Sequence, residues 1–129
     1  MRLSLHPLGL APRIVNLAQW REHLFLRLKH QIDASADPAL IDLLHELQAL
    51  PFDASQSQGP AIDPSGVAVP LQFKTPDGVM SFISTTTVFG TPVDVTLSEL
   101  ALETFFPADA HTAELLRRLS DGQLAADKR

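Results

Sequence analysis

Two amphipathic helices are predicted in the first half of the chain. In the first, apolar side chains recur every three or four residues and so share one helix face; they are Leu17, Trp20, Leu24, Leu28 and Ile32. Asn16 stands at the N-cap position with Gln19 in capping-box register, which predicts a helix over 17–33. A second helix is expected between the cap Asp37 and Pro51, and two helices joined this closely pack as a pair.

Residues 67–89 alternate between apolar and polar positions, a pattern typical of β-strands. The strand over 67–74 contains Pro70, which cannot donate a ladder hydrogen bond, so it is expected at a sheet edge or with a bulge. The turn Thr-Pro-Asp-Gly at 75–78 predicts a hairpin to an antiparallel strand over 79–89. Both faces of that second strand mix apolar and hydroxyl side chains, so the pattern leaves open which face is buried.

The last third of the chain contains one ambiguous segment and one helix. The apolar residues of 97–106 fit a helix and a strand about equally well, and the pattern alone does not decide between them. Pro107 then begins a final helix. The apolar positions of this helix are Ala113, Leu116 and Leu119. It is expected to end near Gly122.

Length and composition fit a single domain over 1–129. It is expected to have an irregular lead-in at 1–12, a mobile loop at 52–66 and a frayed tail at 121–129. The loop is rich in Pro, Gly, Ser, Asp and Gln. No domain boundary is expected there, because neither side has enough apolar surface to fold alone.

Charge and cysteine content exclude several classes of protein. The net charge of −5 disfavours a nucleic-acid surface, which needs basic side chains to replace phosphate counterions. The chain has no cysteine, so it forms neither disulfides nor thiolate metal sites. No apolar run approaches the roughly 20 residues of a membrane span. We therefore expect a cytoplasmic protein that does not associate with membranes.

The polar side chains form no recognisable catalytic or metal-binding pattern. His23 and His30 share roughly one face of the first helix, but the five histidines contain no i, i+4 pair and no HExxH motif, so surface histidine is the better interpretation. The hydroxyl run at 84–87 lacks a Gly-x-Ser-x-Gly elbow. Three acidic residues are interpreted as solvated rather than as a catalytic pair; they are Asp94, Glu99 and Glu103. We expect no enzymatic activity, no metal and no cofactor.

Apolar side chains are the strongest candidates for a binding function. Trp20, Leu24 and Leu28 would face phenylalanines of the sheet. Ordinary core packing is the simpler interpretation of such a stripe, and a ligand wall is the alternative. A ligand there would gain about 0.8 kcal/mol per buried CH₂ group. Hydroxyls such as Ser84 or Thr86 would orient its polar head.

Three stretches of the chain resemble one family. They are HPLGLAPRIVNLAQW (6–20), DPALIDLLHELQALP (37–51), and the part from KTP (74–76) through STTTVFGTPVDVTLSELALETFFPADAHTAELLRRL (84–119). In order and spacing they are similar to MmyB-like ligand-binding domains, which form the C-terminal half of many XRE-family helix-turn-helix transcription regulators. The resemblance covers nearly the whole chain and is weakest at 52–65.

The resemblance implies an α+β, PAS-like fold, with helices packed on one face of a short antiparallel sheet of about three strands. It favours a strand over 99–106, and it implies an apolar cavity that binds a small fatty-acyl-like ligand to control transcription. The side chains expected to line this pocket are Trp20, Leu24, Leu28, Phe73, Phe82, Ser84, Thr86 and Phe106.

Two parts of such regulators are not recognised in this chain: the helix-turn-helix and the first strands of the PAS-like unit. DNA would therefore be contacted only through a helix-turn-helix absent from this chain. The sheet would have an exposed or partner-completed edge, and a homodimer is expected. Two alternatives to the sensor remain. A small cone-shaped isomerase or hydrolase would need a titratable group in the pocket, and a pure dimerisation module would have a filled core.

Overall fold

The chain divides into two compact units, Met1–Val79 and Met80–Arg129. The computed structural model describes residues 1–53, 69–88 and 101–127. The expected loop at 52–66 falls outside these residues except for its first two positions.

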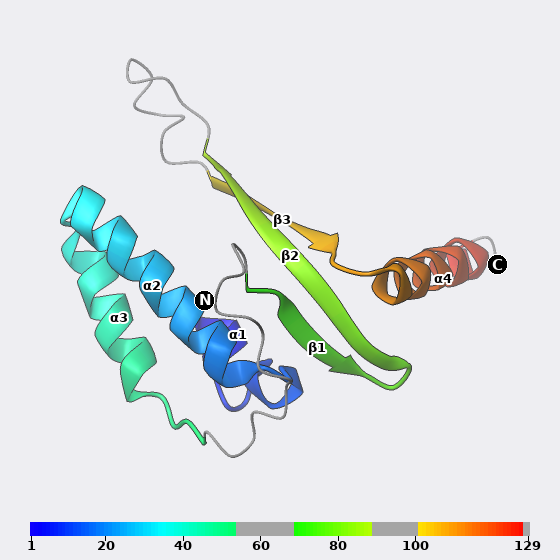
Figure 1. Ribbon diagram of the computed structural model, residues 1–129, viewed down its shortest axis with the longest axis horizontal. Coiled ribbons are helices and arrows are strands. Elements are labelled where there is room, and N and C mark those ends of the chain that lie inside the picture. The colour runs from blue at the N-terminus through cyan, green and yellow to red at the C-terminus, as the bar shows by residue number, and fades with distance from the viewer. Residues whose placement is uncertain (54–68, 89–100, 128–129) are drawn as a thin grey trace. The chain divides into compact units, whose positions relative to one another are not determined.

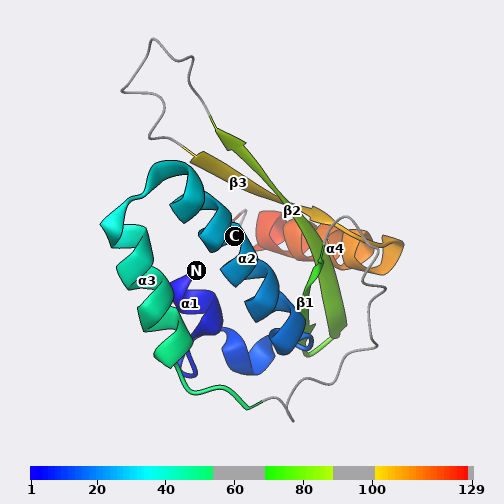
Figure 2. The ribbon, with the colours of Figure 1, turned by 60° about the vertical axis from the view of Figure 1, so that its left-hand side comes forward.

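The first unit is built on a pair of helices. α2 (Leu17–Ser35) and α3 (Pro38–Ala49) lie side by side and run antiparallel (Figures 1 and 2). Ala36 ends α2 with a left-handed φ of 52°. Asp37 then caps α3, because its Oδ1 accepts a hydrogen bond from the Ala39 N–H at 2.9 Å. Both predicted helices and the predicted cap at Asp37 are thus confirmed.

Asn16 occupies the N-cap position of α2, but its side chain does not cap the helix. It is only 2% exposed and turns instead to the strand β1 (Leu71–Thr75). There its Nδ2 donates to the Pro70 carbonyl at 2.8 Å, and its Oδ1 accepts from the Gln72 N–H at 3.1 Å. The predicted capping box is therefore wrong, since the side-chain amide satisfies a distant strand rather than its own helix.

The residues before Asn16 extend the same contact along β1. Val15 N–H donates to the Gln72 carbonyl at 2.9 Å, and Ile14 forms an antiparallel bridge with Phe73. Both backbone polar groups of Gln72 are thereby satisfied. The segment Ile14–Asn16 thus lies along the edge of β1 at which the backbone groups of Gln72 form their hydrogen bonds.

The lead-in at 1–12 is more ordered than its sequence suggests. It contains the helical turn α1 (Arg2–Leu5) and the start of the 3-10 turn η1 (Ala11–Arg13). Between them the chain folds back, and Leu10 N–H donates to the Leu3 carbonyl at 2.9 Å. Gly9 permits this approach, because a Cβ there would collide with the same carbonyl. Local bonding of this kind leaves no periodic signal in the sequence.

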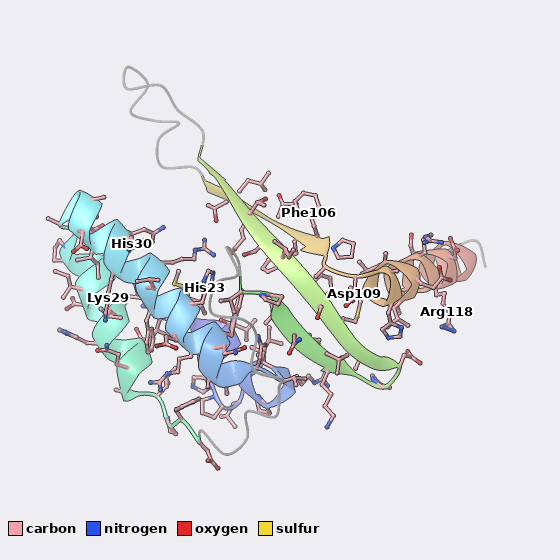
Figure 3. All side chains as sticks on the ribbon, viewed as in Figure 1. His23, Lys29, His30, Phe106, Asp109 and Arg118 are labelled. Carbon is pink, nitrogen blue, oxygen red and sulfur yellow. The ribbon has the colours of Figure 1, made fainter. Side chains whose placement is uncertain are left out.

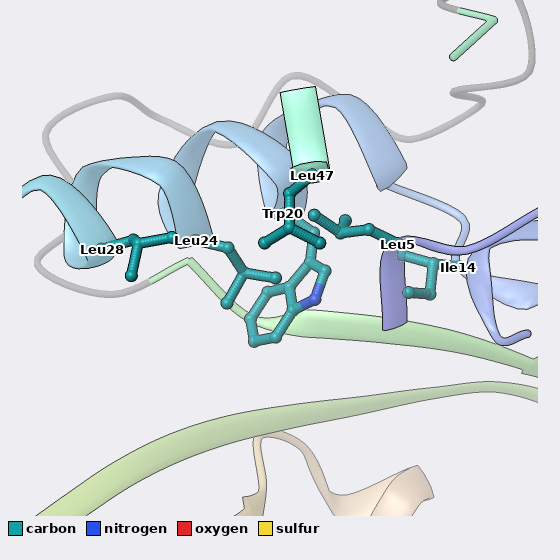
Figure 4. Close-up of a cluster of buried hydrophobic side chains, with 6 residues drawn as sticks. All are labelled: Leu5, Ile14, Trp20, Leu24, Leu28 and Leu47. Carbon is teal, nitrogen blue, oxygen red and sulfur yellow. The ribbon is translucent and has the colours of Figure 1, made fainter. Parts of the chain in front are cut away.

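An apolar cluster holds the described part of the first unit together (Figure 4). Its buried members are Leu5, Ile14, Trp20, Leu24, Leu28 and Leu47. The predicted stripe of α2 supplies three of them, while Leu17 and Ile32 are partly buried against the cluster. Burial of apolar side chains, not helix propensity, therefore fixes which face of α2 is turned inward.

Among the described residues, the sheet has three antiparallel strands in the order β1-β2-β3, with β2 at Gly78–Val88 and β3 at Ala101–Pro107. Gly78 makes the predicted hairpin turn with a φ of 125°. From Ala101 onward, the segment that the pattern left open is the strand β3, as the family resemblance implied. Its first four residues, 97–100, lie outside the described residues. Helices and this sheet confirm the predicted α+β class, which is consistent with a PAS-like arrangement.

In the second unit, α4 (Ala110–Asp127) is joined to β2 by a hydrogen bond to the buried hydroxyl of Thr112. Thr112 is 0% exposed, and its Oγ1 accepts from the Ser81 N–H at 2.8 Å. Next to it, the Ala108 N–H donates to the Ser81 carbonyl at 2.8 Å. At the start of α4, Asp109 Oδ1 accepts from the Thr112 N–H at 2.7 Å, which caps the helix.

Two details of the predicted final helix are wrong. Thr112 and Leu115 are buried, whereas Leu116 and Leu119 are exposed, because the Thr112 hydroxyl is bound to β2 and turns its own face inward. The helix also continues through Gly122, which has no positive φ, instead of ending there. A glycine inside a helix costs only about 1 kcal/mol relative to alanine, so it need not end one.

The Asp109 carboxyl makes the stability of this unit depend on pH. Hydrogen bonds from the backbone and then the hydroxyl of Thr112 hold its pKa below the ordinary value of 3.8. As the pH falls, the Asp109 carboxyl therefore takes up a proton in the unfolded chain before it does so in the folded protein. Its contribution to the free energy of unfolding is complete above about pH 4 and is lost as the pH falls through the native pKa. Asp109→Asn keeps a capping oxygen but does not titrate.

We expect Asp109→Asn to be less stable than the wild type near about pH 6, by less than about 1 kcal/mol because the carboxyl is exposed. The difference should shrink in acid, as measured by urea unfolding across this pH range. A difference that stays constant with pH would contradict this account.

Candidate ligand-binding site

Four of the predicted pocket residues come together in the first unit. Trp20, Leu24 and Leu28 lie on successive turns of α2 and are 1–3% exposed. Phe73, on β1, packs against the cluster that they form. The bridge to Ile14 helps to hold Phe73 there. This group is an apolar surface contributed by one helix and one strand.

The indole of Trp20 adds a polar atom to this surface. Its Nε1 is buried and has no hydrogen-bond partner in the described part of the chain. The ring of His23, one turn along α2, lies 5.6 Å from the indole between centroids and is tilted by 32°. In Figure 4 the benzene ring of the indole points toward Leu24, and the nitrogen lies on the side of Ile14.

The other four predicted residues lie in the second unit, on two different faces of the sheet. Residues opposite each other in the ladder share a face, and successive residues alternate. Phe82, Ser84 and Thr86 therefore share one face, whereas Phe106 pairs with Ile83 on the other. The neighbouring phenylalanine, Phe105, pairs with Ser84 and meets the Phe82 ring edge-on at 6.5 Å. In the described part of this unit, Phe105 therefore lies on the same face of the sheet as Phe82, Ser84 and Thr86.

The described part of the first unit also shows open grooves that the sequence did not indicate. One has a volume of about 270 Å³ and lies between the lead-in, the start of α2 and the end of α3. Its lining residues are Pro7, Ala11, Pro12, Leu17, Pro51, Phe52 and Asp53. This lining is mainly apolar, with a carboxylate from Asp53, so the groove suits the aliphatic part of a small molecule.

Arg21 contacts Phe52, one of the residues that line this groove. Its guanidinium lies 4.6 Å from the Phe52 ring centroid and 4.9 Å from that of Phe25, so both rings make cation–π contacts with it. It also donates to the Gln48 carbonyl at 3.1 Å, near the end of α3. The Phe52 wall is therefore positioned by a cation on α2.

The second groove, of about 280 Å³, lies between α1 and the end of α3. Apolar residues such as Leu3, Leu8 and Leu50 form most of its lining. Arg2 Nε donates to both carboxylate oxygens of Glu46, at 2.9 and 3.0 Å. This bond raises the pKa of Arg2 and lowers that of Glu46. Both side chains are solvent-exposed, so the pair adds little stability.

A comparison with known protein families decides the family of the chain. The model for the MmyB-like transcription regulator ligand binding domain matches residues 1–119. The chain belongs to this family. No significant match was found among curated proteins or among solved structures. A regulatory, ligand-binding role follows from membership.

The described residues of this MmyB-like domain contain no group of three or more His, Asp or Glu side chains that could hold a metal ion. His23 and His30 both lie on α2 (Figure 3). Two of the acidic candidates, Asp94 and Glu99, fall outside the described residues. In the described ranges, no helix is both long and apolar enough to cross a membrane.

Two buried polar side chains in the described part of this MmyB-like domain bind the backbone. Asn16 is bonded to β1, and Thr112 is bonded to Ser81 on β2. Such groups specify how strands and helices join. What the described arrangement offers chemically is apolar surface with few polar contacts, which favours binding.

Proposed function

We propose that the whole chain is the sensory domain of a transcription regulator and binds a small apolar, fatty-acyl-like ligand without catalysing a reaction. The observation that carries this proposal is the family match over residues 1–119. The apolar group on α2 and β1, and the mostly apolar grooves beside it, support an apolar ligand. A ligand of this kind acts by binding one conformational or dimeric state more tightly than another.

This chain has a net charge of −5, which does not suit DNA binding. DNA would therefore be contacted through a helix-turn-helix outside this chain. As part of a transcription regulator, the domain would work in the cytoplasm. The isomerase or hydrolase alternative gains no support from the described residues. The pKa values of Arg2, Glu46 and Asp109 are shifted, but all three side chains are solvent-exposed, and the first two form an ion pair at the open groove beside α1.

Native mass spectrometry of the purified protein, followed by lipid extraction, tests the proposal. We expect a bound small amphiphile that leaves when the chain is unfolded. If the expected pocket faces Ser84, then Ser84→Trp should fill it and lower the bound fraction. Thr85→Trp, on the opposite face of β2, is the matched control and should bind normally. Recovery of only the bare chain mass, also after incubation with fatty acids, would contradict the sensor.

A dimerisation module is the second candidate function, and one observation favours it. β3 stands at the end of the strand order and exposes Leu102, Phe105 and Phe106, the last at 51%. An edge strand with exposed apolar side chains readily pairs with another chain. Light scattering across a concentration series distinguishes the candidates: a ligand-independent dimer supports the module, and a dimer that responds to ligand supports the sensor.

A further inference from the structure

Leu8 is an apolar side chain that projects into solvent from a hydrogen-bonded turn. It is 93% exposed. Its backbone is nevertheless held in place, because the Leu8 N–H donates to His6 Nδ1 at 3.1 Å and the Gly9 N–H donates to the His6 carbonyl at 2.8 Å. A single exposed leucine needs no explanation, but a leucine held beside an open apolar groove marks a surface suited to a partner.

The groove beside this leucine is large enough to hold another leucine side chain. Its apolar lining comes mainly from Leu3, Leu8 and Leu50. A leucine side chain has four carbon atoms, each roughly the size of a water molecule of about 30 Å³, so a groove of about 280 Å³ can take one. The same surface therefore offers both a projecting side chain and a hollow that fits it.

The charges of this surface are also complementary to each other. Arg2 and Glu46 both line the groove. The two hydrogen bonds between them come from Arg2 Nε, so the two terminal nitrogens of the guanidinium take no part in these bonds. A guanidinium has five N–H donors and a carboxylate has about four acceptor positions, so each group can bind a second group of opposite charge.

We propose that this surface docks onto the same surface of a second copy of the chain, about a two-fold axis. We call it the Leu8 surface, and it consists of Arg2, Leu3, Leu8, Glu46 and Leu50. In a two-fold contact the two copies exchange the same interactions. Leu8 of each copy then enters the groove of the other, and Arg2 of each copy lies beside Glu46 of the other.

The inference goes beyond the proposed function and does not depend on it. It also names a surface of the first unit and not the strand edge of β3. Seven described residues line the groove, far fewer than the roughly 20–30 residues on each side of a stable interface. The dimer is therefore expected to be weak and reversible, so that it forms only as the protein concentration rises.

Sedimentation velocity of the full chain, freed of bound lipid, tests the proposal over a concentration series. The wild type should shift from monomer to dimer, and Leu8→Asp should weaken the dimer at least about tenfold, because it puts an unpaired charge into the groove of the other copy. Leu8 is almost fully exposed in its own chain, so the variant should fold. Leu26→Asp is the matched control: Leu26 is 55% exposed and does not line the groove, so this variant should dimerise like the wild type.

Exchange of the charges tests whether the two copies meet through this surface. Arg2→Glu leaves two carboxylates beside the groove, and Glu46→Arg leaves two guanidinium groups, so each variant alone should be monomeric. Equal amounts of the two variants, when mixed, should form a heterodimer, because every carboxylate then meets a guanidinium. A dimer formed through another surface would not respond in this way.

Three results would overturn the inference. The first is a wild type that stays monomeric at every concentration. The second is a dimer that survives Leu8→Asp but is lost in Leu102→Asp, which would place the interface on β3. The third is a Leu8→Asp variant that retains less amphiphile in native mass spectrometry but associates like the wild type, which would make the groove a ligand site. The first two results leave the sensor proposal standing, since that proposal is judged by the bound amphiphile.

Discussion

Leu28→Ala is expected to lower the free energy of unfolding by about 2–5 kcal/mol. Leu28 is 1% exposed and lies in the apolar cluster of the first unit, so its truncation removes buried apolar contacts and leaves a cavity. A loss of this size is a large part of the stability of a small domain, which is typically about 5–15 kcal/mol. Urea unfolding followed by the fluorescence of the single tryptophan measures it, since Trp20 is in the same cluster.

The chain offers a closely matched control for this substitution. Leu26 is on the same helix but 55% exposed, so Leu26→Ala changes the same residue type without making a cavity. It should alter the free energy of unfolding by less than about 0.5 kcal/mol. Equal losses in the two variants would mean that the described cluster is not the core.

Asn16→Ala should cost about 2–6 kcal/mol, which is more than the loss of a helix cap. The substitution leaves the Pro70 carbonyl and the Gln72 N–H without their side-chain partner, and each unsatisfied group costs about 1–3 kcal/mol. Chemical denaturation gives the free energy. Hydrogen exchange should also show faster exchange of the Gln72 amide.

Asn16→Ser and Asn16→Asp separate this role from helix capping. Serine and aspartate are as good as asparagine at an N-cap, so a capping residue would tolerate both changes. The side chain that bonds β1 needs a donor and an acceptor at the reach of an amide. Serine is too short, and aspartate has no donor for Pro70. Both variants should lose stability comparably to Asn16→Ala, and wild-type stability in either would restore the capping interpretation.

The contrast between Leu28 and Asn16 shows what local sequence can and cannot reveal. Leu28 was predicted to be buried, because a period of three to four residues reports directly which helix face is turned inward. Asn16 sits where a capping residue is expected, yet its partners are 54 and 56 positions away. No short-range pattern contains that information.

The same limit explains the errors in α4 and applies to the candidate site. Thr112 has a polar side chain and so adds nothing to an apolar pattern, although the hydrogen bond to Ser81 makes its burial favourable. The groove lined by Pro12 and Phe52 is built from connecting segments, which have no periodicity. Phe82 and Phe106 were both expected in the pocket, but the ladder register places them on opposite faces of the sheet. That register depends on which residues pair across strands, and a single sequence does not reveal this.

The unequal edges of the sheet limit how the protein can associate. Along β1 the Gln72 backbone groups are taken by the segment Ile14–Asn16, whereas β3 ends the strand order of the described residues. A chain that docks through β3 thus presents no second free edge of the same kind at β1. Growth by strand addition would stop at two molecules and not continue into a fibre.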